Sequence, residues 1–195
     1  MTAISPLEGV HKKGTFGDHH QKNESDLLKI SEKKDLFIIQ IVQYKKSKIS
    51  TSEIKIEGLE IPKKNLTVSS NKETRILWSA PRTWLVLTNK ENIAEILKND
   101  FKETDFAITD ISHSRAVIQI EGENAKEVLK KSSPINFNEL EPNNCAGTVF
   151  NGISIVIDFT SNDPDTFNLL TLRSFGESFY HHISDAALEF GYVGK

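Results

Sequence analysis

The chain has 195 residues, of which 24 are basic and 27 are acidic, and its formal net charge is −3. This balance argues against a surface built mainly to hold nucleic acid or anionic lipid. Hydrophobic residues make up 37% of the chain, enough to bury a core, and no apolar run approaches the roughly 20 residues that span a bilayer. The single cysteine excludes an internal disulfide and a cysteine-cluster metal site within the chain, and it predicts a reducing, cytoplasmic location.

Residues 1–35 differ from the rest because they are rich in lysine, histidine and glycine and show almost no periodic apolar pattern. Such a segment buries too little surface by itself to offset the entropy lost on ordering. A disordered tail and an arm that orders against another chain both fit this composition. Leu7 and Phe16 stand as isolated apolar residues near turn-permitting glycines. We therefore predict an extended N-terminal arm over residues 1–35, with Leu7 and Phe16 as partner-interface candidates.

Residues 36–105 are predicted to form a first α+β unit. Its strands are short runs rich in β-branched and aromatic residues, and its helix carries apolar residues on one face. The expected elements are strands at 36–42, 66–68, 75–78 and 84–87, followed by a helix at 90–98 that Asn89 is placed to cap.

Residues 106–195 are predicted to form a second α+β unit that ends in the clearest helix of the chain. Ser174 and Glu177 have capping-box spacing, and Gly191 is placed to end the helix. The order of elements favours two small units of antiparallel or mixed sheet with helices packed on one face. The expected elements are strands at 116–120, 153–159 and 167–172, a helix bearing Ala125, Val128 and Leu129, and a last helix whose apolar stripe is Phe175, Phe179, Ile183, Ala186, Ala187 and Phe190.

Two histidine pairs are the first candidates for metal binding, His19-His20 and His181-His182. Adjacent side chains on a helix diverge by about 100°, so neighbouring histidines rarely bind one ion together. We interpret both pairs as solvated. The sequence also contains no Walker motif, no dinucleotide glycine fingerprint after a strand and no HExxH motif.

Cys145 and the cluster of Asp110, Ser112 and His113 are the candidates for nucleophilic catalysis. A catalytic thiol needs a histidine or another cationic partner, and the sequence places none beside Cys145, which we interpret as a buried, inert thiol. Catalytic triads are assembled from residues distant in sequence, so the second cluster is interpreted as turn chemistry at the start of a strand. The residues therefore predict no catalytic, cofactor-binding or metal site in this chain.

Several segments together resemble the gamma subunit family of heterotetrameric sarcosine oxidase. The resemblance covers nearly the whole chain and is most specific over residues 109–129 and 173–191. The matching segments are Ser5-Pro6-Leu7, Trp78-Ser79-Ala80-Pro81-Arg82-Thr83-Trp84-Leu85, Thr109-Asp110-Ile111-Ser112-His113-Ser114-Arg115, Ile120-Glu121-Gly122-Glu123-Asn124-Ala125 with Leu129, and Arg173-Ser174-Phe175 leading to Ala186-Ala187-Leu188-Glu189-Phe190-Gly191.

The resemblance implies a non-catalytic subunit of an oxidoreductase. The family's complex demethylates sarcosine oxidatively, yielding glycine, hydrogen peroxide and a one-carbon unit that tetrahydrofolate accepts. The resemblance places FAD, FMN, NAD and tetrahydrofolate on the larger alpha and beta chains and zinc on the small delta chain. The gamma chain carries no recognised active-site residue, and its implied role is to brace the flavin-bearing beta chain.

The central block is also similar to the wider folate-binding aminomethyltransferase family. Those proteins are much longer, and this chain lacks their additional domain and an evident folate-binding acidic residue. A stand-alone folate-binding module is therefore the second hypothesis. A partner-binding domain unrelated to amine oxidation is the third, and the sequence does not define the N-methyl substrate.

Overall fold

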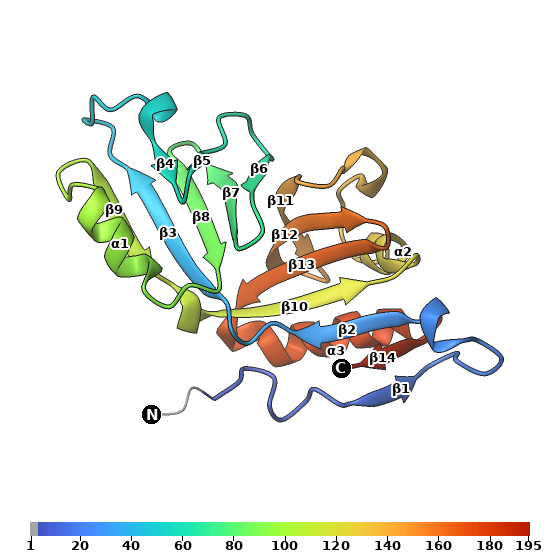
Figure 1. Ribbon diagram of the computed structural model, residues 1–195. Coiled ribbons are helices and arrows are strands. Elements are labelled where there is room, and N and C mark those ends of the chain that lie inside the picture. The colour runs from blue at the N-terminus through green and yellow to red at the C-terminus, as the bar shows by residue number, and fades with distance from the viewer. Residues whose placement is uncertain (1–3) are drawn as a thin grey trace. The chain divides into compact units, whose positions relative to one another are not determined.

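The computed structural model describes residues 4–195, and it divides into two compact units (Figure 1). The seven-stranded unit comprises the described residues up to Lys34 together with Ser114–Pro142 and Gly147–Lys195. The five-stranded unit comprises Asp35–His113 and Asn143–Ala146. The predicted α+β class is confirmed. The expected boundary at 35/36 lies one residue from the observed one at 34/35, whereas the expected boundary at 105/106 lies at 113/114 in the structure.

The seven-stranded unit is a mixed sheet in the order β1-β14-β2-β10-β13-β12-β11. Strand β14 runs parallel to β2 and antiparallel to β1, while β10 runs antiparallel to both β2 and β13. The strands are β1 (Gly14–Phe16), β2 (Leu28–Glu32), β10 (Arg115–Glu121), β11 (Cys145–Phe150), β12 (Ile153–Asn162), β13 (Asp165–Leu172) and β14 (Tyr192–Gly194).

One face of this sheet packs against helices α2 (Ala125–Lys130) and α3 (Gly176–Ala187). The alternation predicted for β12 holds, since Ile153, Ile155 and Ile157 all point into this core. The rings of Phe159 and Phe167 stack in the same core with centroids 4.3 Å apart. Alternating apolar side chains therefore define the buried face, as the sequence pattern predicts.

Residues 4–34 are built into this unit and do not form the separate arm that we expected. Strand β2 lies inside the sheet, and β1 is added beyond β14. Leu7, with 0% of its surface exposed, is part of the core. Ser5 Oγ donates to the two carboxylate oxygens of Glu32 at 2.7 and 2.5 Å, and the Glu32 side chain is 3% exposed. The alternating pattern of β2 is only five residues long and lies between polar segments, so the sequence did not indicate a strand there.

Close backbone approaches join the N-terminal segment to the last residues of the chain. Asp18 N donates to Leu188 O at 2.8 Å, and a side chain at Gly17 would place its Cβ 2.2 Å from the same oxygen. At Gly194 a Cβ would lie 2.0 Å from Lys12 O. Only glycine fits these positions without moving the backbone. Figure 1 shows the blue N-terminal segment beside the red strand β14.

The five-stranded unit is an antiparallel sheet in the order β6-β7-β8-β3-β9, with α1 (Ile93–Asp100) packed beside it. A two-stranded hairpin of β4 (Lys55–Ile56) and β5 (Leu59–Glu60) adds Ile56 to the core. The five strands are β3 (Phe37–Gln43), β6 (Val68–Ser70), β7 (Thr74–Ala80), β8 (Thr83–Thr88) and β9 (Phe106–Asp110).

Both predicted helix caps differ from the structure. Helix α1 begins after Asn92 rather than Asn89, and no side chain caps it. The capping box of Ser174 and Glu177 does not form, because residues 173–175 make a 3₁₀ turn and Phe175 occupies the N-cap position. Phe175 is consequently exposed, unlike the rest of the predicted stripe. No helix in the described part of the chain is long and apolar enough to cross a membrane.

Phe179→Ala is expected to destabilise the chain strongly, because Phe179 is fully buried and its ring packs edge-on against Phe150. Loss of a buried phenylalanine costs about 3–5 kcal/mol in the free energy of unfolding. The exposed neighbour His181 is the control, and His181→Ala should stay within ~0.5 kcal/mol of the parent chain. Equal denaturant midpoints for the two variants would contradict the orientation of α3.

Leu7→Ala is expected to destabilise the isolated chain by about 2–5 kcal/mol, because it opens a cavity in the seven-stranded unit. Leu188→Ala removes the same atoms from a side chain that is 41% exposed and serves as the matched control. Urea unfolding of the two purified variants measures the difference. A Leu7→Ala chain as stable as the control would mean that the N-terminal segment is an appended arm after all.

Candidate functional site

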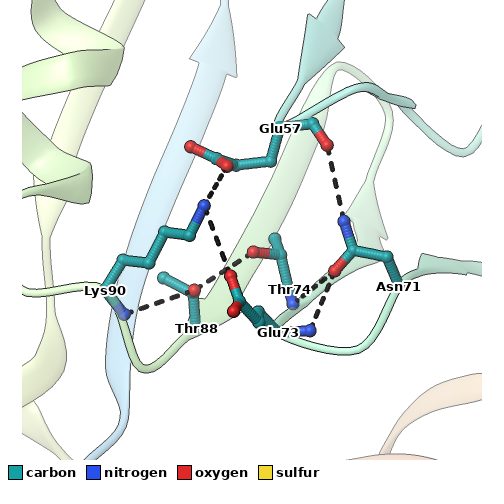
Figure 2. A network of polar contacts seen from close by, with 6 residues as sticks. All are labelled: Glu57, Asn71, Glu73, Thr74, Thr88 and Lys90. Atoms are coloured by element: carbon teal, nitrogen blue, oxygen red, sulfur yellow. Dashed lines mark hydrogen bonds and ion pairs between the residues drawn. The ribbon is translucent and has the colours of Figure 1, made fainter.

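The best organised polar cluster among the described residues lies in the five-stranded unit and centres on Lys90 (Figure 2). The Lys90 ammonium group donates to the carboxylate of Glu57 and lies 3.5 Å from that of Glu73. Glu57 and Gly58 form the turn between β4 and β5, both with positive φ angles, at 51° and 77°. Positive φ angles in such a two-residue turn favour Asn, Asp or Gly over glutamate. The ion pair with Lys90 therefore fixes the Glu57 side chain at an unfavourable turn position.

Hydrogen bonds extend this cluster to two further turns (Figure 2). Asn71 Oδ1 accepts from the backbone nitrogens of Glu73 and Thr74 at 2.9 and 2.8 Å, and its amide donates to Glu57 O at 3.4 Å. Thr74 Oγ1 donates to Thr88 Oγ1 at 3.1 Å, which in turn accepts from Lys90 N at 3.4 Å. The cluster thus ties three chain reversals at one end of the sheet.

The chemistry of this cluster is structural. The hydrogen bond that Lys90 donates to Glu57, with smaller contributions from Glu73, raises the pKa of Lys90 above its ordinary value. A lysine that acts as a nucleophile or general base needs a lowered pKa, so that the neutral amine is populated near neutral pH. Lys90 is instead held as a cation between two carboxylates.

A hollow of about 650 Å³ on the five-stranded unit offers no defined ligand chemistry either. Its floor is apolar, with Phe101 packed edge-on against Phe106 at 4.9 Å between ring centroids. The hydrogen bond from Ser47 is the main cause that lowers the pKa of Asp105 at its rim, so this carboxylate stays ionised. Opposite charges of equal number surround the floor, from Lys46, Lys48 and Lys102 and from Glu53, Asp100 and Asp105.

The histidine pairs are not assembled into a metal site. His19 donates through Nδ1 to Gly17 O at 2.7 Å, and its ring lies beside that of His20. His181 is exposed, while His182 lies 2.9 Å from the amide nitrogen of Asn151. Among residues 4–195, no three His, Cys, Asp or Glu side chains come together as a metal-binding group.

Cys145 is buried, as predicted, and its thiol donates to Trp78 O at 3.3 Å and to Thr67 O at 3.5 Å. Asp110 accepts from both the hydroxyl and the backbone nitrogen of Ser112, at 2.6 and 2.9 Å. Within the described residues, no hydrogen bond links Ser112 to the exposed His113. This arrangement is the turn that the sequence indicates, and His113 is not placed as a base beside the hydroxyl.

The two interface candidates lie at different depths. Leu7 is enclosed by this chain's own core, where no partner contact is possible in the observed arrangement. Phe16 is half-buried and stacks on Tyr192 with ring centroids 5.2 Å apart, so one ring face is used within the chain. A partner contact at Phe16 stays a prediction.

Sequence reasoning missed the cluster around Lys90, because its members come from three turns separated by 14 to 33 residues. The Glu57-Gly58 pair between two short apolar runs is the signal that indicates the first turn. The convergence of Glu57 and Glu73 on Lys90 depends on strand pairing that no local pattern contains.

A family model described as "Sarcosine oxidase, gamma subunit family" matches residues 48–189. The chain belongs to this family. A curated relative, the sarcosine oxidase subunit gamma of Corynebacterium sp. (strain U-96), is 31% identical over 121 residues. That match covers 60% of this chain and 58% of the relative, which is less than two thirds of the relative's length.

Solved structures show the same fold. A chain of the heterotetrameric sarcosine oxidase from Corynebacterium sp. U-96, in complex with pyrrole 2-carboxylate, superposes with a TM-score of 0.80 at 20% identity, covering 96% of this chain and 95% of that one. Aminomethyltransferase T of the glycine cleavage system from Bartonella henselae gives a TM-score of 0.63 at 14% identity, covering 88% of this chain and 49% of that one. The family resemblance read from the sequence is therefore confirmed, and the aminomethyltransferase likeness extends to the fold.

Lys90→Met is expected to lower the melting temperature because it leaves Glu57 and Glu73 without their shared cation. Lys63→Met, which breaks the exposed ion pair with Glu60, is the matched control and should change little. A pKa that is higher in the folded state means that the stabilisation is complete below the ordinary lysine value of 10.5 and is lost as the pH rises through the folded value.

Melting curves of the parent chain and both variants between pH 7 and pH 11 test this expectation. The difference between parent and Lys90→Met should be constant to about pH 9.5 and shrink above the ordinary lysine pKa. A difference that already disappears between pH 7 and pH 9 would contradict a raised pKa at Lys90.

Proposed function

We propose that this chain is the non-catalytic gamma subunit of a heterotetrameric sarcosine oxidase, assembled with alpha, beta and delta chains and bracing chiefly the beta chain. The family match over residues 48–189 carries this proposal. The structural likeness to a chain of such a heterotetramer, over nearly the full length of both chains, supports it.

In this proposal the complex is an oxidoreductase that acts on the CH–NH group of sarcosine with oxygen as acceptor. Two electrons pass to oxygen and form hydrogen peroxide, glycine is released, and the methyl carbon is transferred to tetrahydrofolate. FAD, FMN, NAD, tetrahydrofolate and zinc belong to the other subunits. The cytoplasm is the proposed location, in keeping with the single buried cysteine of this chain.

The state of the buried carboxylates supports a non-catalytic role. Two buried acidic side chains are already engaged, Glu32 with Ser5 and Asp158 with Asn168. The Asn168 amide donates to Asp158 Oδ2 at 3.2 Å, and Asn168 Oδ1 accepts from Gln119. A carboxylate that holds a substrate amine or a pterin ring must be available in a cavity, and these two are paired within the sheet.

The alternative is a stand-alone folate-binding module, which the structural likeness to aminomethyltransferase T favours. The superposition covers 49% of the longer enzyme at 14% identity. It therefore supports a shared fold and gives no evidence for a folate-binding site in this chain. The hollow lined by Phe101 carries equal numbers of basic and acidic side chains, so its charge does not favour a pterin over other ligands.

The purified chain alone is expected to be colourless, and co-expression with the alpha, beta and delta chains of the same organism should yield a yellow complex that contains it. The reason is that flavin binding is assigned to the larger chains. Absorbance near 450 nm and subunit analysis after size-exclusion chromatography measure both points. Stoichiometric flavin on the isolated chain would contradict the proposal.

Titration of the isolated chain with tetrahydrofolate separates the two hypotheses. The subunit proposal expects no saturable binding in a calorimetric titration. Saturable one-to-one binding together with failure to co-purify with the larger chains would establish the folate-binding module instead.

A further inference from the structure

The turn between β11 and β12 carries a sequence with a reactivity of its own. It consists of Asn151 and Gly152, which are both exposed and have positive φ angles of 47° and 80°, as in a type I′ turn. An asparagine followed by glycine is prone to spontaneous deamidation, because the next backbone nitrogen can attack the side-chain amide and glycine has no side chain to hinder it. Asn151-Gly152 is the single Asn-Gly pair in the sequence.

The surroundings of Gly152 leave the attacking nitrogen free. A Cβ built at Gly152 would meet no atom within 4 Å, so the turn faces open space. Within residues 4–195, the Gly152 nitrogen donates to no other group. Asn138 is the matched contrast, because it is also exposed but is followed by Glu139, whose backbone nitrogen donates to Asn136 O at 3.3 Å. The two asparagines therefore differ at the group that reacts.

His182, on helix α3, holds the other reacting group, which is the side-chain amide of Asn151. Nδ2 of Asn151 lies 2.9 Å from Nδ1 and 3.2 Å from Nε2 of His182. An amide nitrogen only donates, so a neutral imidazole accepts this bond, and either tautomer presents an acceptor nitrogen within 3.2 Å. The bond restricts the side-chain torsions of Asn151, and donation from Nδ2 strengthens the amide resonance, which makes Cγ less electrophilic. Both effects oppose attack on Cγ.

We propose that Asn151 is a deamidation site of this chain and that His182 restrains the reaction as a positioning residue. In the first step the Gly152 nitrogen loses its proton to a solvent base and attacks Cγ of Asn151. The N–Cγ bond forms, the Cγ–Nδ2 bond breaks, and Nδ2 leaves as ammonia after taking a proton from water. One water molecule then opens the cyclic imide, so that amide and water become acid and ammonia without any transfer of electrons.

The products differ from the parent chain in both charge and geometry. Aspartate replaces an amide donor with a carboxylate that only accepts, so the hydrogen bond that Asn151 donates to His182 is lost. Isoaspartate in addition inserts one methylene group into the backbone of a two-residue turn, whose flanking residues Phe150 and Ile153 are both buried in the core. The inference concerns this chain alone and does not depend on the proposed function.

Peptide mass spectrometry of the purified full chain tests the modification site. The chain is incubated at about pH 8, above the ordinary titration range of histidine, and conversion of amide to acid is followed over time in the peptides that contain each asparagine. Asn151 is expected to convert faster than Asn138 in the same molecule. Equal rates at the two asparagines, or no conversion at Asn151, overturn the proposed site.

Variants at the neighbouring histidines test the restraint. His182→Ala removes the acceptor and should raise the rate at Asn151 about fivefold, the factor that one ordinary hydrogen bond is worth. His182→Gln keeps an acceptor oxygen and should react at close to the parent rate, which loss of the imidazole packing alone would not allow. The exposed neighbour His181 is the control, and His181→Ala should leave the rate at Asn151 unchanged.

The rate at Asn138 separates loss of one hydrogen bond from a general loosening of the fold. If His182→Ala acts through the bond, the rate rises at Asn151 and stays at the parent value at Asn138, even where the melting temperature of the variant falls. An equal rise at both asparagines overturns the role of His182. So does a rate at Asn151 in His182→Ala that is equal to or below that of the parent, or a His182→Gln chain that reacts as fast as His182→Ala.

Discussion

Strand β14 lies between β1 and β2, and this placement of the C-terminal residues is the constraint on which the seven-stranded unit depends. Tyr192 is paired with Leu28 in the parallel register and with Phe16 in the antiparallel one. Backbone groups of β14 are therefore paired with both β1 and β2. Without β14, the facing edges of β1 and β2 would lose these backbone hydrogen bonds. The burial of Leu7 and the close approach at Gly194 follow from the same arrangement.

In the five-stranded unit, the polar cluster around Lys90 also joins segments that are distant in the sequence. A cation shared by two carboxylates fixes turns that local propensity leaves weakly defined, including a left-handed backbone at Glu57. Strained backbone and converging charges often indicate an active site. Here the raised pKa of Lys90 agrees with a cation kept between two carboxylates, where it holds turns in place.

The likeness to aminomethyltransferase T separates fold from chemistry. Both chains share one arrangement of sheets and helices, yet function is decided by the side chains placed on it. In this chain the buried acids bond to Ser5 and Asn168, and the described cysteine bonds to backbone carbonyls.

From the sequence alone, the α+β class, the buried face of β12 and the inward position of Phe179 followed, because these depend on periods of two and 3.6 residues within one element. The turn at Asp110 and the burial of Cys145 also followed from local chemistry.

The position of residues 4–34 within the sheet did not follow from the sequence, because β1 has three residues and pairs with a strand almost 180 positions later in the chain. The predicted capping box at Ser174 was wrong because residues 173–175 form a 3₁₀ turn. The pairing of Arg115 with Leu172 depends on the register between two strands and has no local sequence signal. Local periodicity decides which face of an element is buried, and tertiary pairing decides which distant residues meet, because the energy of a non-local contact is absent from any window of sequence.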